Sequence, residues 1–124
     1  MNPSSDSPVI ALRSPAHSAD LLSTRTIFTE YARSLPIDLG FQNFTQELDA
    51  LPGEYSEPRG ALLLAWVDGA VAGCCALRPF DACDYANAAE MKRLYVRPAF
   101  RGLGLGRLLT EGILDAARAA AYHC

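Results

Sequence analysis

The sequence predicts an α/β fold (α+β, with a mixed sheet) in the order β-α-α-β-β-β-α. Apolar residues recur at helical spacing over 18–36 and 105–120, which predicts two amphipathic helices. Between them, the apolar run 61–67 followed by Asp68-Gly69 is typical of a β-hairpin. A glycine-rich segment, 101–106, separates the last strand from the last helix. A chain of 124 residues has room for one such domain.

The first elements are predicted to be a strand and two helices. Residues 1–7 are rich in Ser, Pro and Asp and form an expected disordered segment, so the domain covers 8–124. Val9–Arg13 is the first strand. Ser18 is the expected cap of the first helix, with Asp20 in its first turn. A shorter helix follows over 43–51. The buried stripe of the first helix consists of Leu21, Thr24, Phe28, Tyr31 and Leu35.

Three further strands and a helix complete the pattern. The run 61–67 is apolar throughout, as expected of a strand covered on both faces, and 70–77 returns antiparallel to it. The segment 80–87 shows neither a helical nor a strand pattern of apolar residues. The fourth strand is predicted over 89–96. The last helix begins at Leu105. Its apolar face is expected to contain Leu105, Leu108, Leu109, Ile113, Ala116, Ala117 and Ala120.

The order of elements predicts a sheet with one open edge. A strand and a helix that packs back on the sheet are normally followed by a parallel strand beside the first. The sequence ends at Cys124, where that strand would begin. We therefore expect an incomplete domain whose free strand edge could pair two copies as a homodimer.

Charge and composition exclude several classes of protein. The net charge of −3 argues against a nucleic-acid partner, because binding to backbone phosphates requires a dense basic surface. The N-terminus lacks the basic and apolar regions of a signal peptide. No apolar run is long enough to span a bilayer. The expected setting is therefore cytoplasmic, without a membrane partner.

The four cysteines are expected to be reduced thiols. Cys74 and Cys75 are neighbours in a predicted strand, so their side chains point to opposite faces of the sheet. The chain has no Cys-x-x-Cys pair, and both histidines are distant from the cysteines in sequence. No metal site is therefore predicted.

The segment Arg101-Gly102-Leu103-Gly104-Leu105-Gly106 carries the functional prediction. Alternate glycines leave backbone N–H groups uncovered, and the helix that follows adds the positive end of its dipole. This arrangement is typical of a site for pyrophosphate. A dinucleotide fingerprint is excluded, because Gly102, Gly104 and Gly106 are one residue too closely spaced. A P-loop is excluded because Arg107-Leu108 replaces its Lys-Ser/Thr.

The spacing Arg101-x-x-Gly104-x-Gly106, together with the preceding residues 90–98, closely resembles the acetyl-CoA signature of the GNAT superfamily of N-acetyltransferases. The resemblance is most specific over 89–118 and extends loosely over the chain. It implies a GNAT-like fold that lacks the family's C-terminal strand, helix and final strands. It also implies that the loop amides hold the CoA pyrophosphate and that a bulged fourth strand pairs with the pantetheine arm. The implied cofactor-binding residues are Leu94, Tyr95, Val96, Arg101, Gly102, Leu103, Gly104, Leu105, Gly106 and Arg107.

The resemblance also implies residues for catalysis and for the acceptor. Glu90 matches a position where related enzymes place a general base; the alternative is an exposed carboxylate paired with Lys92. The family's general acid, a tyrosine near the CoA sulfur, belongs to the missing C-terminal part, and Tyr122 comes too early to replace it. The implied acceptor-site residues are Tyr31, Phe41, Gln42, Phe44 and Tyr55, of which Tyr31 and Phe44 also suit a plain core.

Two functions therefore remain open. The first is an acetyl-CoA-dependent N-acetyltransferase that acts on a small-molecule amine by direct attack on the thioester. The second is a truncated domain that binds CoA but is catalytically defective, and that another chain completes or pairs with.

Overall fold

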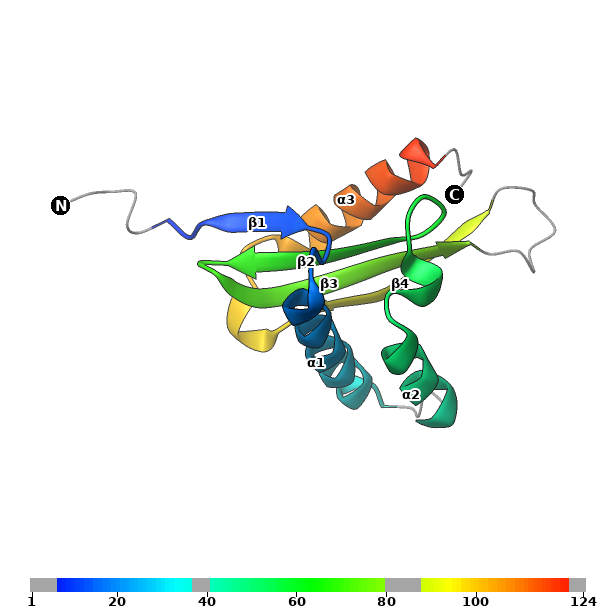
Figure 1. The fold of residues 1–124 in the computed structure, drawn as a ribbon. Helices are drawn as coiled ribbons and strands as arrows, with labels where there is room; N and C mark the ends of the chain where they lie inside the picture. Colours follow the sequence, from blue (N-terminus) through cyan, green and yellow to red (C-terminus); the bar gives the residue numbers. More distant parts are fainter. Residues whose placement is uncertain (1–6, 37–40, 80–87, 121–124) are drawn as a thin grey trace.

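The computed structural model describes residues 7–36, 41–79 and 88–120, with side chains from Phe44 onward in the second range (Figure 1). The predicted order of elements is confirmed. The elements are β1 (Ile10–Arg13), α1 (Ser18–Ser34), α2 (Phe41–Ala50), the short 3₁₀ turn η2 (Gly53–Tyr55), β2 (Ala61–Val67), β3 (Ala70–Pro79), β4 (Ala89–Val96), the 3₁₀ turn η3 (Pro98–Phe100) and α3 (Leu105–Ala119).

The four strands form one sheet in the order β1-β2-β3-β4, and each neighbouring pair is antiparallel. The predicted α/β class is confirmed, and no parallel pair occurs among the described strands. The β2–β3 hairpin turns at Asp68 and Gly69, whose φ angles of 51° and 84° suit a tight two-residue turn. β4 lies at one edge and hydrogen-bonds only to β3 among the strands described.

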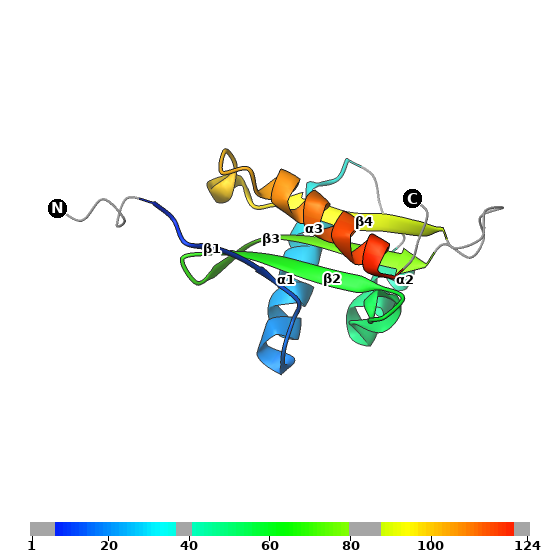
Figure 2. The same cartoon turned by 90° about the horizontal axis from the view of Figure 1, so that it is seen from above.

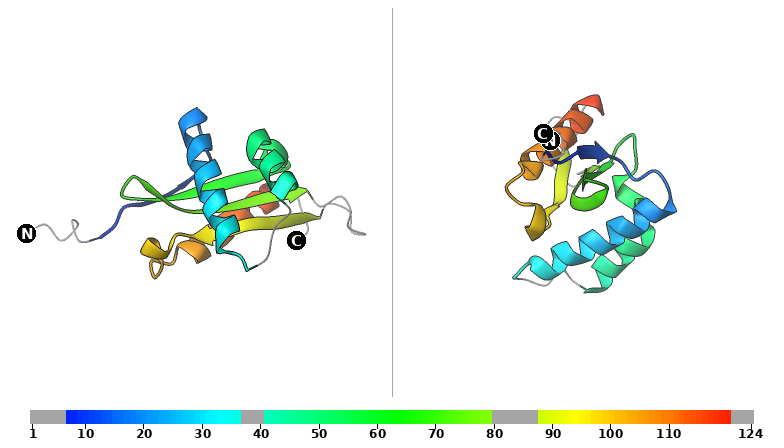
Figure 3. Two further views of the ribbon diagram at one scale, coloured as in Figure 1. Left: turned by 90° about the horizontal axis from the view of Figure 1, so that it is seen from below. Right: turned by 90° about the vertical axis from the view of Figure 1, so that its left-hand side faces the viewer.

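Helices cover both faces of the sheet. α3 packs on one face, and α1 and α2 lie on the other (Figures 2 and 3). β2 and β3 are buried on both faces, as their apolar sequences predict. Cys75 joins the core beneath α3, whereas Cys74 joins the core beneath α1. The predicted opposite orientation of these two buried thiols is therefore confirmed.

Two local predictions are wrong. Ser18 is not the cap of α1: His17 occupies that position and its side chain makes no capping hydrogen bond. The Asp20 carboxylate, 4% exposed, instead accepts the Ala16 N–H at 2.9 Å, because it can reach back past the helix start. Leu108 is 38% exposed and is not buried with the rest of the apolar face of α3.

Some predictions lie outside the described residues. They concern most of the segment 1–7, the loop 80–87 with Cys83, and the terminal residues Tyr122, His123 and Cys124. Over 7–36, 41–79 and 88–120, no helix is long and apolar enough to cross a membrane. The same ranges contain no group of three or more His, Cys, Asp or Glu side chains that could hold a metal ion.

Candidate functional site

The glycine loop leads directly into the N-terminus of α3. Gly102 and Gly104 have φ angles of 92° and 78°, a left-handed conformation that strains residues with side chains. A Cβ atom added at Gly102, Gly104 or Gly106 would meet no other atom within 4 Å, so the loop opens to its surroundings. No side chain caps the helix at Gly104, and the first N–H groups of a helix lack intrahelical partners. The loop therefore suits an anion such as a phosphate.

Two arginines flank this loop. Arg101 is exposed, and its Nε–H donates to the Val96 carbonyl oxygen at 3.0 Å. Its guanidinium carbon lies 6.0 Å from the centre of the Tyr95 ring. Arg107 is also exposed and donates to Glu111 at 2.8 Å one turn further along α3. Arg101 is thus held at the end of β4, whereas the charge of Arg107 is partly offset on the helix surface.

β4 contains the bulge that the resemblance implied. Cys74 pairs with Tyr95 and Ala76 pairs with Lys92, so two residues of β4 face the single residue Cys75. Arg93, within the bulge, has a φ angle of 62°. The Cys74 thiol donates to the Arg93 carbonyl oxygen at 3.1 Å, which gives the bulged peptide a buried partner.

The outer edge of β4 is a row of peptide groups. The Arg97 N–H donates to the Ala72 carbonyl oxygen at 2.8 Å, beyond the aligned pair Gly73 and Val96. In an antiparallel ladder, this pattern directs the N–H and C=O of Val96 away from β3. An extended chain of amides could pair with such an edge.

Arg93 and Glu47 form a buried ion pair between β4 and α2. Two hydrogen bonds of 2.9 and 2.7 Å join the guanidinium to both carboxylate oxygens. The guanidinium lies 5.6 Å from the Tyr31 ring centre and 5.4 Å from that of Phe44. Burial alone lowers the pKa of Arg93, but the hydrogen bonds to Glu47 and the negative charge of Glu47 together outweigh burial and raise it. The pair fixes α2 against the bulge.

This pair was not predicted from the sequence. The sequence contains one signal for such a pair: an arginine lies within a strand that contributes to the core. A guanidinium that becomes buried there requires a carboxylate partner. The sequence does not indicate which of the many acidic residues that partner is.

Glu90 lies at the start of β4 and is held by Arg78. Arg78 Nε–H donates to Glu90 at 2.9 Å, and its Nη1 group donates to Glu54 of η2 at 3.0 Å. The hydrogen bond to Glu90 is the main reason that the pKa of Arg78 is raised. The Glu90 side chain is 40% exposed. The alternative pairing of Glu90 with Lys92 is wrong, because Arg78 on the neighbouring strand is directly aligned with Glu90.

A shallow hollow of about 300 Å³ lies along the first half of β4. Tyr31 of α1 faces it, and the Tyr31 and Tyr95 rings meet edge to face with centres 6.2 Å apart. The fold thus brings Tyr31 and Glu90 together, although they are far apart in sequence. The hollow is lined by Tyr31, Glu90, Met91, Lys92, Arg93 and Leu94.

Two of the other residues predicted for the acceptor site, Phe44 and Tyr55, pack with the core. Phe44 packs against Arg93 and the core beneath α1. Tyr55 is 3% exposed and stacks edge to face on Phe28, so it is a core residue. Burial raises the pKa of Tyr55, and the nearby charge of Glu47 raises it further. The side chains of Phe41 and Gln42 lie outside the described part of the structure.

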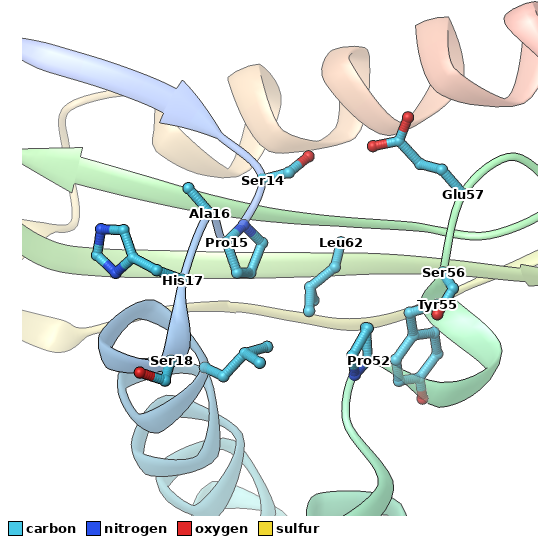
Figure 4. Close-up of a pocket in the computed structure, with 11 residues that line it drawn as sticks. Ser14, Pro15, Ala16, His17, Ser18, Pro52, Tyr55, Ser56, Glu57 and Leu62 are labelled. Carbon is cyan, nitrogen blue, oxygen red and sulfur yellow. The ribbon is translucent and has the colours of Figure 1, made fainter.

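A second cavity, of about 320 Å³, lies at the start of α1 (Figure 4). It is bounded by the β1–α1 connection and by η2 with the residues that follow it, and Leu62 of β2 lines it as well. Among the predicted site residues whose side chains the structure describes, only Tyr55 lines this cavity. The predicted cofactor and catalytic residues therefore belong to β4 and the glycine loop.

The chain is similar to known acetyltransferases. The model of the acetyltransferase (GNAT) family matches residues 24–124. An uncharacterized N-acetyltransferase of Schizosaccharomyces pombe is 38% identical over 104 residues, which cover 83% of this chain and 62% of that protein. The uncharacterized N-acetyltransferase YjgM of Escherichia coli is 30% identical over 94 residues, 76% of this chain and 54% of that protein.

A solved structure shows the same fold. The yncA protein of Salmonella typhimurium, determined with its cofactor acetyl-CoA, matches 93% of this chain and 66% of its own with a TM-score of 0.66 and 24% identity. The chain thus spans less than two thirds of the length of each of these three proteins.

Proposed function

Because the chain belongs to the GNAT family of acetyltransferases, we propose that it transfers the acetyl group of acetyl-CoA to the amine of a small molecule. The observation that carries the proposal is the open glycine loop at the N-terminus of α3, next to a free strand edge. The acetyl-CoA of the Salmonella structure, which shares this fold, supports the choice of donor.

The residues of the loop and of β4 fit this donor. The space around Gly102, Gly104 and Gly106 would accept a pyrophosphate, and the N–H groups of the first turn of α3 would donate to it. Arg101 adds a cation at the end of β4. The outward N–H and C=O of Val96 would pair with the amides of the pantetheine arm, next to Leu94 in the bulge. The bound thioester supplies the acetyl group.

Glu90 is the proposed general base. An amine attacks a thioester only in its neutral form, so the acceptor ammonium must lose a proton before or during attack. The Glu90 carboxylate, 40% exposed beside the hollow, would accept that proton directly or through a water molecule. Arg78 holds the carboxylate at the start of β4, and Tyr31 lines the same hollow.

The donor site is tested by titrating the protein with CoA in a calorimeter. Gly104→Glu should abolish binding, because a carboxylate would fill the loop and repel the phosphates. Gly69→Glu is the matched control: its φ angle of 84° and open surroundings resemble those of Gly104, but it lies in the β2–β3 turn. Equal CoA affinities of the Gly104→Glu variant and the wild type would refute the assigned loop.

The catalytic step is tested by measuring thiol release from acetyl-CoA over a panel of amines. Glu90→Gln should lower the rate at least about 100-fold, in the range expected for loss of a general base. Asp115→Asn, which removes an exposed carboxylate further along α3, should retain the wild-type rate. An unchanged rate in Glu90→Gln removes this residue from the mechanism. CoA binding without turnover on any amine would leave a binding function in place of transfer.

A further inference from the structure

We propose that the acceptor carries a carboxylate beside its amine and that Lys92 binds this carboxylate. The inference rests on the proposed function and names the class of its acceptor: amino acids and related amino carboxylates. It depends on how charge is balanced around the hollow along β4. Three charged residues line that hollow, namely Glu90, Lys92 and Arg93.

Two of these three residues have an ion-pair partner within the fold, although Arg78, the partner of Glu90, also binds Glu54. Arg78 holds Glu90 at 2.9 Å, and Glu47 holds Arg93 through two hydrogen bonds. The Lys92 side chain forms no ion pair within 4.0 Å in the part of the chain that the structure describes, and the residue is partly buried. The ammonium of such a residue, without a counter-ion, is favourable only if an anion or water satisfies it. Among the described residues, Lys92 is therefore the charged residue of this hollow that has no ion-pair partner.

The position of Lys92 relative to Glu90 suits a bifunctional acceptor. Both residues are aligned with β3 residues on the face of the sheet that α1 covers, Glu90 with Arg78 and Lys92 with Ala76. Two residues along a strand span about 6.6 Å. The flexible side chain of Lys92 and the carboxylate of Glu90 can therefore approach one small molecule from neighbouring points. The ammonium of the acceptor would face Glu90, and its carboxylate would face Lys92.

The electrostatics favour this orientation over its reverse. A reversed acceptor would place its carboxylate beside Glu90 and its ammonium beside Lys92, so that both contacts would be between like charges. An amine without a carboxylate would leave Lys92 unmatched in the complex.

The first test compares acceptors that differ only in the carboxylate. Thiol release is measured with the standard amino acids, their carboxamides and the amines left when the carboxylate is removed. The amino acids should exceed their carboxamides about tenfold in kcat/KM, in the range of one charge-assisted contact. Lys92→Met should bring that ratio close to one, mainly by raising KM for the amino acids. Lys92→Arg should keep most of the preference, and Arg118→Met, which removes an exposed cation on α3, should keep all of it.

The second test uses a property of the sequence, in which Lys92 is the only lysine. Acetylation of Lys92 by an amine-reactive ester is followed by peptide mass spectrometry. CoA together with N-acetyl-L-leucine should slow the reaction of Lys92 more than CoA with N-acetyl-L-leucinamide. Equal protection by CoA alone would assign Lys92 to a phosphate of the donor and overturn the inference.

The outcomes separate this inference from the proposed function. Turnover with equal kcat/KM for amino acids and carboxamides refutes the role of Lys92 and leaves the acetyltransferase activity in place. A preference for amino acids that persists in Lys92→Met also refutes it. Absence of turnover with every amine refutes the proposed function, and this inference with it.

Discussion

The Arg93–Glu47 pair should be the most important polar contact between the helical layer and β4. Arg93 is 8% exposed and Glu47 is 19% exposed, and two hydrogen bonds of 2.9 and 2.7 Å join them. Replacing Arg93 by Met removes the guanidinium but keeps an unbranched side chain at the same strained φ angle. The variant therefore leaves the Glu47 carboxylate partly buried and without its ion-pair partner.

The expected cost follows from this burial. Removing one partner of a buried ion pair costs about 3–5 kcal/mol. Because Glu47 retains some contact with solvent, we expect the lower end, about 3 kcal/mol in the free energy of unfolding. For a domain of this size, each kcal/mol shifts Tm by roughly 3–5 °C, so Tm should fall by about 10 °C.

Urea denaturation followed by the fluorescence of Trp66, the only tryptophan, measures the change. The control is Arg107→Met, which breaks a pair whose side chains are 86% and 56% exposed and should cost less than about 0.5 kcal/mol. The double variant Arg93→Met, Glu47→Leu should recover part of the loss, because no unpaired charge remains. A loss in Arg93→Met as small as that of the control, or no recovery in the double variant, would refute the reasoning.

Three further predictions concern separate parts of the molecule. Burial raises the pKa of Cys75 to about 12 from an ordinary value of 9.0, so above pH 9 the unfolded chain loses this proton while the folded chain keeps it. The free energy of unfolding should therefore fall between pH 9 and 12, more steeply in wild type than in Cys75→Ala; equal slopes would contradict this. Gly60→Ala should lower the free energy of unfolding by about 2–3 kcal/mol and lower Tm accordingly. The added Cβ would lie 2.7 Å from the Tyr55 Cα and closer still to the Glu54 carbonyl oxygen. An unchanged Tm in a thermal scan would contradict this close packing. Arg101→Ala should weaken CoA binding about tenfold in calorimetry, with a reduced dependence on salt, and unchanged affinity would show that this cation does not face the phosphates.

Much of the fold could be predicted because its signals are local. The run 61–67 is apolar on both faces, and Asp68-Gly69 supplies the positive φ angles of a tight turn, so the hairpin follows from adjacent residues. Cys74 and Cys75 point to opposite faces because side chains alternate along any strand. The cap of α1 was predicted wrongly because the helix begins one residue earlier than expected, where the His17 carbonyl oxygen accepts the N–H groups of Asp20 and Leu21.

The partners of the charged residues could not be predicted in this way. Glu90 pairs with Arg78 because the β3–β4 register aligns them. This register includes a bulge whose position cannot be identified from the residue types. Arg93 forms its ion pair with Glu47, which is 46 residues away in the sequence. Contacts of this kind depend on the packing of α2 against the sheet, which emerges only when the whole chain has folded.

The sequence by itself determined the order of the elements, the hairpin and the glycine loop, because each depends on backbone preferences and on the spacing of neighbouring residues. It also indicated Glu90 and the loop as candidates. The tertiary structure decided which carboxylate each of these arginines binds, that Tyr31 and Glu90 share one hollow, and that Lys92 has no ion-pair partner there among the described residues. Electrostatic pairing depends on distances through space, and only the folded chain sets those distances.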